Sequence, residues 1–89
     1  MRRYEVAPSL QKILNKLLKR DGQLCERVLK KIEEIVNCED AEHYKNLSYG
    51  LKDKKRVHIG PFVLVFKLVK EENKIIFLDF GNHDEIYAR

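Results

Sequence analysis

The spacing of apolar residues changes once along this chain, and the change restricts the fold more than any other feature of the sequence. Between residues 10 and 36, apolar residues recur three or four positions apart, as on one face of an amphipathic helix. Between residues 56 and 80 they alternate or run together, as in β-strands. Helices therefore form one block and strands another, which predicts an α+β fold with an antiparallel sheet.

Two helices are predicted in the first block. The first is expected to begin after Ser9, a good N-cap residue, and to end at Asp21-Gly22, where glycine favours a left-handed stop. The second is expected to end near Cys38, so that the pair forms a helical hairpin. A short strand over residues 2–6 precedes them.

A polar connection over residues 39–55 leads to three predicted strands, at residues 56–59, 62–69 and 74–80. The stretch 62–69 is almost entirely apolar, which is typical of a central strand covered on both faces. Gly81 is expected to end the last strand. The predicted order is β-α-α-β-β-β, with the N-terminal strand and helical hairpin packed on a small antiparallel sheet, in one domain of residues 1–89.

Composition restricts the class of protein, its cellular location and the cofactors that it could bind. Hydrophobic residues make up 44% and charged residues 36% of the chain, which excludes a disordered tail. No apolar run approaches the roughly 20 residues that span a bilayer, and no signal peptide is recognisable, so we expect a cytoplasmic protein without membrane contact. Cys25 and Cys38 lie too far apart in one predicted helix for a disulfide. The cysteine and histidine spacing predicts no zinc site, and no cofactor is expected.

The net charge and the positions of His, Tyr and Arg residues indicate which partners and which chemistry to expect. Eighteen Lys and Arg against fourteen Asp and Glu leave a net charge of +4, which favours a nucleic acid or an acidic protein as partner. Arg56 and His58 project from one face of a predicted strand, and His83 and Tyr87 follow the last strand. If the fold gathers them at one end of the sheet, a cation could hold a phosphate while an imidazole takes a proton from a ribose 2′-OH. Such a group could cleave RNA without a metal.

Simpler explanations exist for each of these residues. His58 could be a half-exposed strand residue, His83 part of a polar turn, and Tyr87 a ring packed over the sheet edge. The cations considered for RNA binding are Lys12, Lys16, Lys52, Lys54 and Lys55, which could equally be solvated surface. Spacing alone therefore predicts only a small basic α+β domain.

Several short segments occur in an order that is more specific than any one of them. They are the opening Tyr4-Glu5-Val6-Ala7-Pro8-Ser9, the Leu- and Lys-rich hairpin, Tyr44-Lys45-Asn46-Leu47 with Gly50-Leu51, Lys55-Arg56-Val57-His58-Ile59-Gly60, the apolar stretch 62–69, and Asp79-Phe80-Gly81-Asn82-His83-Asp84-Glu85-Ile86-Tyr87. Together they resemble the RelE/ParE superfamily of bacterial and archaeal toxins over almost the whole chain. The resemblance implies a RelE-like fold and a cognate antitoxin. It also implies metal-independent cleavage of mRNA on the ribosome, through attack of a 2′-OH on the adjacent phosphate.

The resemblance assigns roles residue by residue. Arg56 would bind the scissile phosphate, and His58 and His83 would be candidates for proton transfer. Tyr87 would stack on a base or orient the nucleophile. The chain departs from the RelE pattern at Val63, where RelE-type enzymes often carry an arginine; losing such a cation could cost on the order of 10²–10³-fold in rate. The alternatives are a ParE-type toxin, whose relatives share the fold and act on DNA gyrase, or a degenerate toxin that keeps only its antitoxin interaction.

Overall fold

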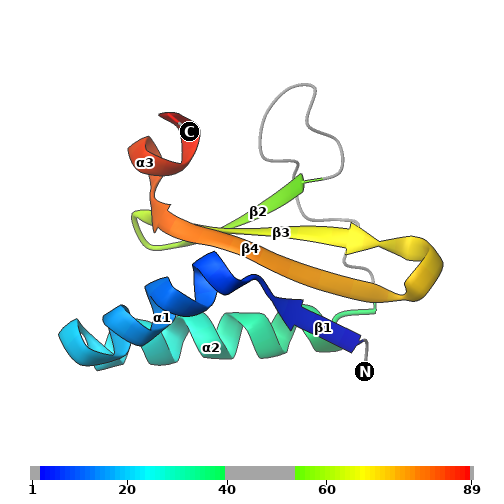
Figure 1. Cartoon of the computed structure of the whole chain (residues 1–89), viewed down its shortest axis with the longest axis horizontal. Coiled ribbons are helices and arrows are strands. Elements are labelled where there is room, and N and C mark those ends of the chain that lie inside the picture. Colours follow the sequence, from blue (N-terminus) through cyan, green and yellow to red (C-terminus); the bar gives the residue numbers. More distant parts are fainter. Residues whose placement is uncertain (1–2, 40–53, 89) are drawn as a thin grey trace.

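A four-stranded sheet with two long helices against one face organises the chain (Figure 1). A computed structural model describes residues 3–39 and 54–88. The elements are β1 (Arg3–Val6), α1 (Pro8–Arg20), α2 (Gly22–Asn37), β2 (Lys54–Ile59), β3 (Phe62–Val69), a 3₁₀ turn (Lys70–Glu72), β4 (Lys74–Asn82) and α3 (His83–Ala88). The predicted α+β class and the predicted order of helices and strands are confirmed, and α3 is an additional element.

The strands lie in the order β1-β4-β3-β2. The pairs β2–β3 and β3–β4 are antiparallel, as expected for consecutive strands joined by short turns. β1 runs parallel to β4, with Arg3 beside Lys74 and Val6 beside Phe77. The sheet is therefore a three-stranded antiparallel meander with one parallel edge strand.

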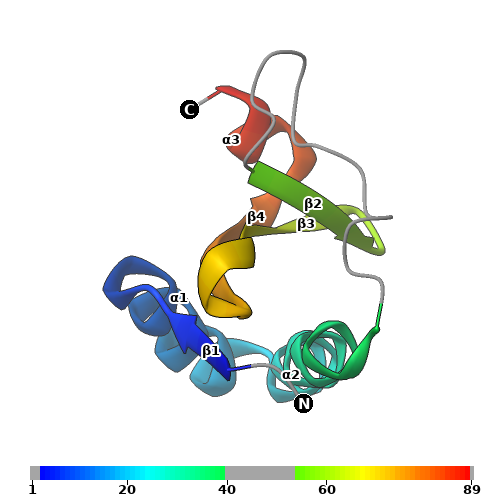
Figure 2. The same cartoon turned by 90° about the vertical axis from the view of Figure 1, so that its right-hand side faces the viewer.

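The main core lies between the sheet and the helices α1 and α2, which occupy the same side of the sheet (Figure 2). Its buried members include Leu10, Leu14, Val28, Ile32, Ile35, Leu64, Phe66, Ile75, Phe77 and Phe80. Val57 and Ile59 of β2 belong to this core. Because side chains alternate along a strand, Arg56 and His58 belong to the opposite face, as predicted.

A second, smaller cluster lies on that opposite face. Val63 and Val65 of β3 are buried there with Ile86 of α3, and Leu78 packs against them. β4 holds an extra residue at this point: Val65 pairs with Asp79 and the next residue of β3 pairs with Phe77, so Leu78 forms a β-bulge. The bulge lets Leu78 join the cluster that seats α3 on the sheet.

The ends of the helices differ from the prediction. α1 begins at Pro8 and not after Ser9, and no side chain caps it. Pro8 has no N–H to satisfy, so it suits the first helical position without a cap. The prediction that Gly22 ends the first helix was also wrong, because Gly22 begins α2. Asp21 separates the two helices, and its side chain accepts a hydrogen bond from the Leu24 N–H at 3.1 Å.

β2 is longer than predicted, beginning at Lys54 because Lys54 and Lys55 already pair with β3. The rest of the predicted connection, residues 40–53, lies outside the described residues and includes Lys52 and the Tyr44–Leu51 segment. The turn predicted after β2 is confirmed, and Gly60 takes the left-handed conformation there, with φ of 59°.

β4 also continues past its predicted end. Gly81 does not stop the strand, because it pairs with Val63 and the strand runs on to Asn82. Neither Cys25 nor Cys38 forms a disulfide. Within residues 3–39 and 54–88, no helix has the length and apolar character needed to cross a membrane.

Candidate functional site

The structure brings together the four residues that the sequence analysis singled out for chemistry. Arg56 Nη1 lies 2.9 Å from His58 Nε2. The rings of His58 and His83 are stacked, with centroids 6.1 Å apart and planes at 11°. The centroids of His83 and Tyr87 are 4.4 Å apart. We call this continuous set, from guanidinium to phenol, the Arg–His–His–Tyr row.

Strand direction explains why the row forms. His58 pairs with Val63 of β3, and Val63 pairs with Gly81 of β4. In an antiparallel meander the first and third strands run the same way, so the ends of β2 and β4 meet. The four residues are thus gathered at one end of the sheet, as the sequence analysis considered. It is the end of β2 that carries His58 to α3.

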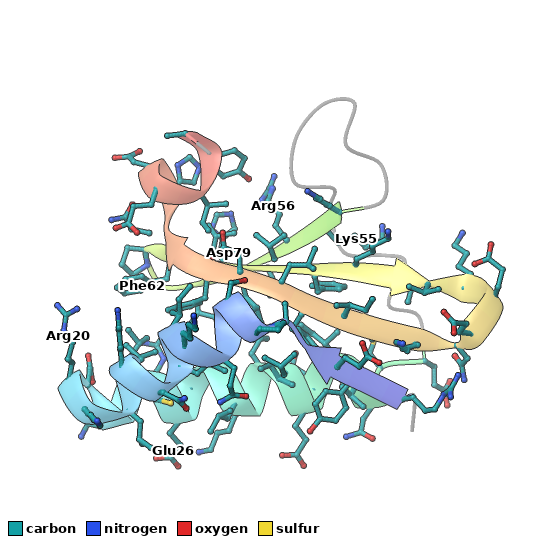
Figure 3. All side chains as sticks on the ribbon, in the orientation of Figure 1. Arg20, Glu26, Lys55, Arg56, Phe62 and Asp79 are labelled. Carbon is teal, nitrogen blue, oxygen red and sulfur yellow. The ribbon has the colours of Figure 1, made fainter. Side chains whose placement is uncertain are left out.

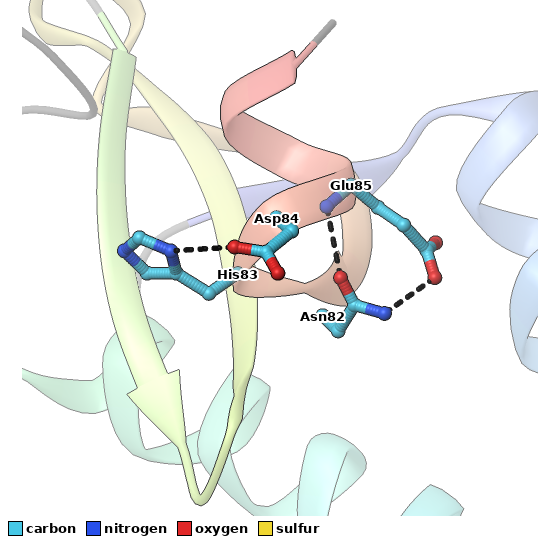
Figure 4. Close-up of polar contacts among 4 residues, drawn as sticks. All are labelled: Asn82, His83, Asp84 and Glu85. Atoms are coloured by element: carbon cyan, nitrogen blue, oxygen red, sulfur yellow. Dashed lines mark hydrogen bonds and ion pairs between the residues drawn. The ribbon is translucent and has the colours of Figure 1, made fainter.

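Two side chains that the sequence analysis did not single out begin α3 (Figure 4). Asn82 Oδ1 accepts a hydrogen bond from the Glu85 N–H at 2.8 Å, and Asn82 Nδ2 donates to Glu85 Oε1 at 2.7 Å. The first bond is that of an N-cap residue, and the second joins the two side chains, whereas in a capping box the carboxylate would accept from the Asn82 backbone N–H. The Asn-x-x-Glu spacing is the signal that would have predicted the helix. Within α3, His83 and Tyr87 are four residues apart and share one side, whereas Ile86 is buried toward the sheet.

The hydrogen-bond partners constrain the two imidazoles differently. A guanidinium has donors only, so His58 Nε2 accepts from Arg56 and the proton of a neutral His58 ring lies on Nδ1. His83 Nδ1 lies 3.7 Å from Asp84 Oδ1, an electrostatic contact longer than a hydrogen bond (Figure 4). The Asp84 carboxylate therefore lies on the Nδ1 side of the ring, and Nε2 is the ring nitrogen on the other side.

Solvent reaches this surface, since His58 and His83 are exposed and Tyr87 is 37% exposed. Figure 3 shows Arg56 on the α3 side of the sheet and Arg20 at the far end of α1, on the helical side. Val63, at the position of the expected arginine, is fully buried in the cluster beneath α3. It supports the helix that carries His83 and Tyr87 and has no surface of its own in the site.

The described lysines considered for RNA binding are spread over two layers of the molecule. Lys54 begins β2 on the face that carries Arg56 and His58, whereas Lys55 alternates with it along the strand. Lys12 and Lys16 lie on α1, in the helical layer, and Lys52 is outside the described residues. Among residues 3–39 and 54–88, no three His, Cys, Asp or Glu side chains gather as ligands for a metal ion.

Comparison with known proteins identifies the class. No protein-family model matches the chain. A Methanocaldococcus jannaschii protein with the provisional name toxin RelE4 is 49% identical over 90 residues, which cover 100% of this chain and 94% of that protein.

Three solved structures share the fold. The isolated E. coli RelE toxin has a TM-score of 0.76 at 18% identity, covering 99% of this chain and 93% of that chain. A metal-bound toxin from Helicobacter pylori has a TM-score of 0.72 at 30% identity, covering 96% and 98%. A chain of the intact E. coli RelBE toxin–antitoxin complex has a TM-score of 0.71 at 16% identity, covering 92% and 96%.

The fold and these likenesses define a small toxin of a toxin–antitoxin module. Within that class, the chain belongs to the RelE toxin family.

Proposed function

We propose that this RelE-family toxin is an endoribonuclease that cleaves mRNA on the ribosome. The observation that carries the proposal is the Arg–His–His–Tyr row, which places a guanidinium, two imidazoles and a phenol on one accessible surface. These groups can bind a phosphate and move protons, so the reaction needs no metal to supply either step.

In the proposed reaction the 2′-oxygen of the ribose attacks the adjacent 3′-phosphorus. The new bond joins the 2′-oxygen to phosphorus, and the bond from phosphorus to the 5′-oxygen breaks, leaving a cyclic phosphate and a 5′-hydroxyl. His83 Nε2 accepts the 2′-OH proton. His58 donates a proton to the leaving 5′-oxygen in its imidazolium form, in which Nε2 carries a hydrogen and cannot accept from Arg56, so the Arg56 guanidinium turns to the phosphate. Proton exchange with water then restores both rings. Tyr87, beside His83, stacks on a base or orients the nucleophile.

Lysines outside the row would bind the RNA backbone in this proposal. Lys54 and Lys55 extend the row's strand, and Lys12 and Lys16 belong to a helix with four cationic and no acidic residues. Counterion release from phosphates would make their contribution depend on salt. The role of Lys52 rests on the sequence alone.

A cognate antitoxin is the proposed protein partner, since the E. coli RelE neighbour forms such a complex. The surface proposed for it is a groove of about 530 Å³ between α1, α2 and β1. Tyr4, Leu18 and Leu29 line it with 50%, 64% and 51% of their surface exposed. The proposed occupant is an antitoxin segment with one apolar face and acidic residues, which complements the cationic α1. Ribosomes and antitoxin together would place the protein in the cytoplasm.

A toxin that binds a protein target without cutting RNA is the second candidate. Buried Val63 favours it, because an arginine is missing where RelE-type enzymes often carry one. A gyrase supercoiling assay separates the two candidates: inhibition without RNA cleavage supports a ParE-type toxin. Inhibition of neither process supports a degenerate toxin that binds only its antitoxin.

Primer extension on programmed ribosomes tests the leading proposal. We expect the parent protein to cleave mRNA and His83→Ala to lower the rate by roughly 10²–10⁴-fold, the usual contribution of a proton-transfer group. Tyr87→Ala should also impair cleavage. Lys30→Ala, which changes an exposed side chain of α2, should not. Intact mRNA with a folded parent, under conditions where an active RelE toxin cleaves, would refute the proposal.

A further inference from the structure

α3 carries two of the four row residues, yet it has only six residues. A helix of this length is not stable by itself in water. Two attachments hold it. Ile86 is buried against Val63 and Val65, and Asn82 and Glu85 form their reciprocal hydrogen bonds at its first turn.

We propose that the Asn82–Glu85 pair positions His83 and Tyr87 for the reaction. Both partners act through the helix, so neither has to touch RNA. The consequence for cleavage rests on the proposed function, whereas the effect on ring geometry does not.

Asn82, the first residue of this pair, is held in place by the sheet. Asn82 is the last residue of β4 and pairs with Phe62, and the His83 N–H donates to the Pro61 oxygen at 3.3 Å. From that fixed point, Asn82 holds the backbone of Glu85 at 2.8 Å and its carboxylate at 2.7 Å. His83 lies inside the loop that these bonds close, so its backbone, from which the side chain projects, is held on both sides.

The position of Tyr87, near the C-terminal end of α3, depends on the same pair. Tyr87 follows Glu85 by two residues, and its ring meets His83 at 4.4 Å only while the first helical turn is intact. Without the pair, Ile86 would still anchor α3, but the turn that carries His83 could rotate. A displacement of about 1 Å in a reacting group can cost on the order of 10²-fold in rate.

The chain contains a matched control for the loss of a helix cap. Asp21 accepts a hydrogen bond from the Leu24 N–H, three residues on, at 3.1 Å. Asn82 makes the same type of bond to the Glu85 N–H. Asp21→Ala therefore removes an equivalent cap at the junction of α1 and α2. Asp21 lines the same pocket as Asn82 and Glu85, but it lies outside the row, and the variant keeps both bonds of the pair, so it reports the cost of a lost cap.

The experiment compares Asn82→Ala, Glu85→Ala, Glu85→Gln and Asp21→Ala with the parent. Both Glu85 variants lose the same charge, but glutamine keeps an oxygen that can accept from Asn82 Nδ2. NMR of the free protein measures the ring-current shifts between His83 and Tyr87. Single-turnover cleavage on programmed ribosomes, over a range of ribosome concentrations, gives the maximal rate and the half-saturating concentration separately.

We expect Asn82→Ala to lose most of the ring-current shift and to lower the maximal cleavage rate by about 10–100-fold, with half-saturation changed less than about twofold. Glu85→Gln should lose much less than Glu85→Ala in both measurements. Asp21→Ala should lower the melting temperature and leave the shifts and the maximal rate as in the parent.

Two results would overturn the inference: parent-like shifts and cleavage in Asn82→Ala, or an equal loss of cleavage in Asp21→Ala. If the parent cleaves no RNA, the proposed function fails and the ring-current shifts alone decide. Their loss in Asn82→Ala but not in Asp21→Ala supports positioning by the pair, and their retention in Asn82→Ala refutes it.

Discussion

Val63 lies directly beneath α3, with its side chain fully buried against Val65, Leu78 and Ile86. An arginine at this position could not keep its guanidinium in water unless α3 moved. Burying an unpaired cation is far more costly than burying a methyl group. The local packing therefore favours valine, whatever chemistry the site performs.

We predict that Val63→Arg destabilises the fold by several kcal/mol and does not accelerate RNA cleavage, because the charge must be buried or α3 displaced. Val63→Ala, which leaves a small cavity, should cost about 1–3 kcal/mol. Urea denaturation measures both free energies of unfolding. A Val63→Arg protein as stable as the parent and faster in cleavage would show that this position opens onto the site.

Among the elements, α3 shows most clearly what sequence patterns could not supply. Arg56 and His58 could be placed on one face from strand alternation alone. The distance from His58 to His83 could not, because it depends on a six-residue helix with too few turns for apolar periodicity. The Asn82 and Glu85 spacing was the available signal for that helix. Its docking, however, depends on the bulge at Leu78, which no spacing in the sequence indicates.

The strands β4 and β1 also depend on pairing that their own sequences do not indicate. Gly81 has a low intrinsic preference for strands, but pairing with β3 outweighs it. The parallel partnership of β1 with β4 joins segments about seventy residues apart, so packing of the whole chain decides it. The central strand, by contrast, was predicted within its observed bounds, because continuous apolar character over 62–69 reflects burial on both faces.

At the scale of one helix, α1 carries Lys12, Lys16, Lys19 and Arg20 and no acidic residue. We predict that the double variant Lys12→Gln with Lys16→Gln weakens binding to ribosomal RNA. The slope of log affinity against log salt concentration should fall by about 1–2, since each phosphate contact contributes nearly one unit. Binding titrations with fluorescent RNA at several salt concentrations measure the slope.

The matched control for α1 removes the same charge from α2. Lys30 and Lys31 are paired with Glu26 and Glu34, at 3.4 and 3.1 Å. Lys30→Gln with Lys31→Gln should change the slope less. Because Lys30 and Lys31 are already paired with carboxylates, they displace fewer counterions from the RNA. Equal changes in both double variants would show that net charge, and not the α1 surface, governs binding.

Over the whole molecule, the apolar groove and the Arg–His–His–Tyr row belong to opposite layers, whereas the lysines of α1 share a layer with the groove. α1, α2 and β1 border the apolar groove. α3, which carries His83 and Tyr87 of the row, lies on the other side of the sheet from α1 and α2 (Figure 2). A partner held in the groove would therefore leave the row accessible unless a further segment of that partner crosses the sheet edge. Antitoxin binding and RNA cleavage should be separable by mutation.

We predict that Leu18→Glu with Leu29→Glu weakens binding of the proposed cognate antitoxin by at least about tenfold and leaves cleavage unchanged. Both leucines are more than half exposed, so their loss should cost little stability, whereas acidic groups in an apolar groove would repel an acidic partner. Calorimetric titration measures the affinity. Gln23→Glu, exposed on α2 outside the groove, is the charge control. Parent-like affinity in the double variant would place the antitoxin elsewhere.

The bulge in β4 also bears on how this chain can change in length. β4 holds one residue more than its pairing with β3 requires, at Leu78 and Asp79. Deleting the codon for either residue would leave a regular ladder in which Phe77 and Phe80 keep their places in the core. A deletion elsewhere in the strand would need the bulge to migrate. When this chain is aligned with a relative that is one residue shorter in this strand, the gap should therefore be placed at residues 78–79. An alignment without that gap would pair His83 with the wrong residue of the relative.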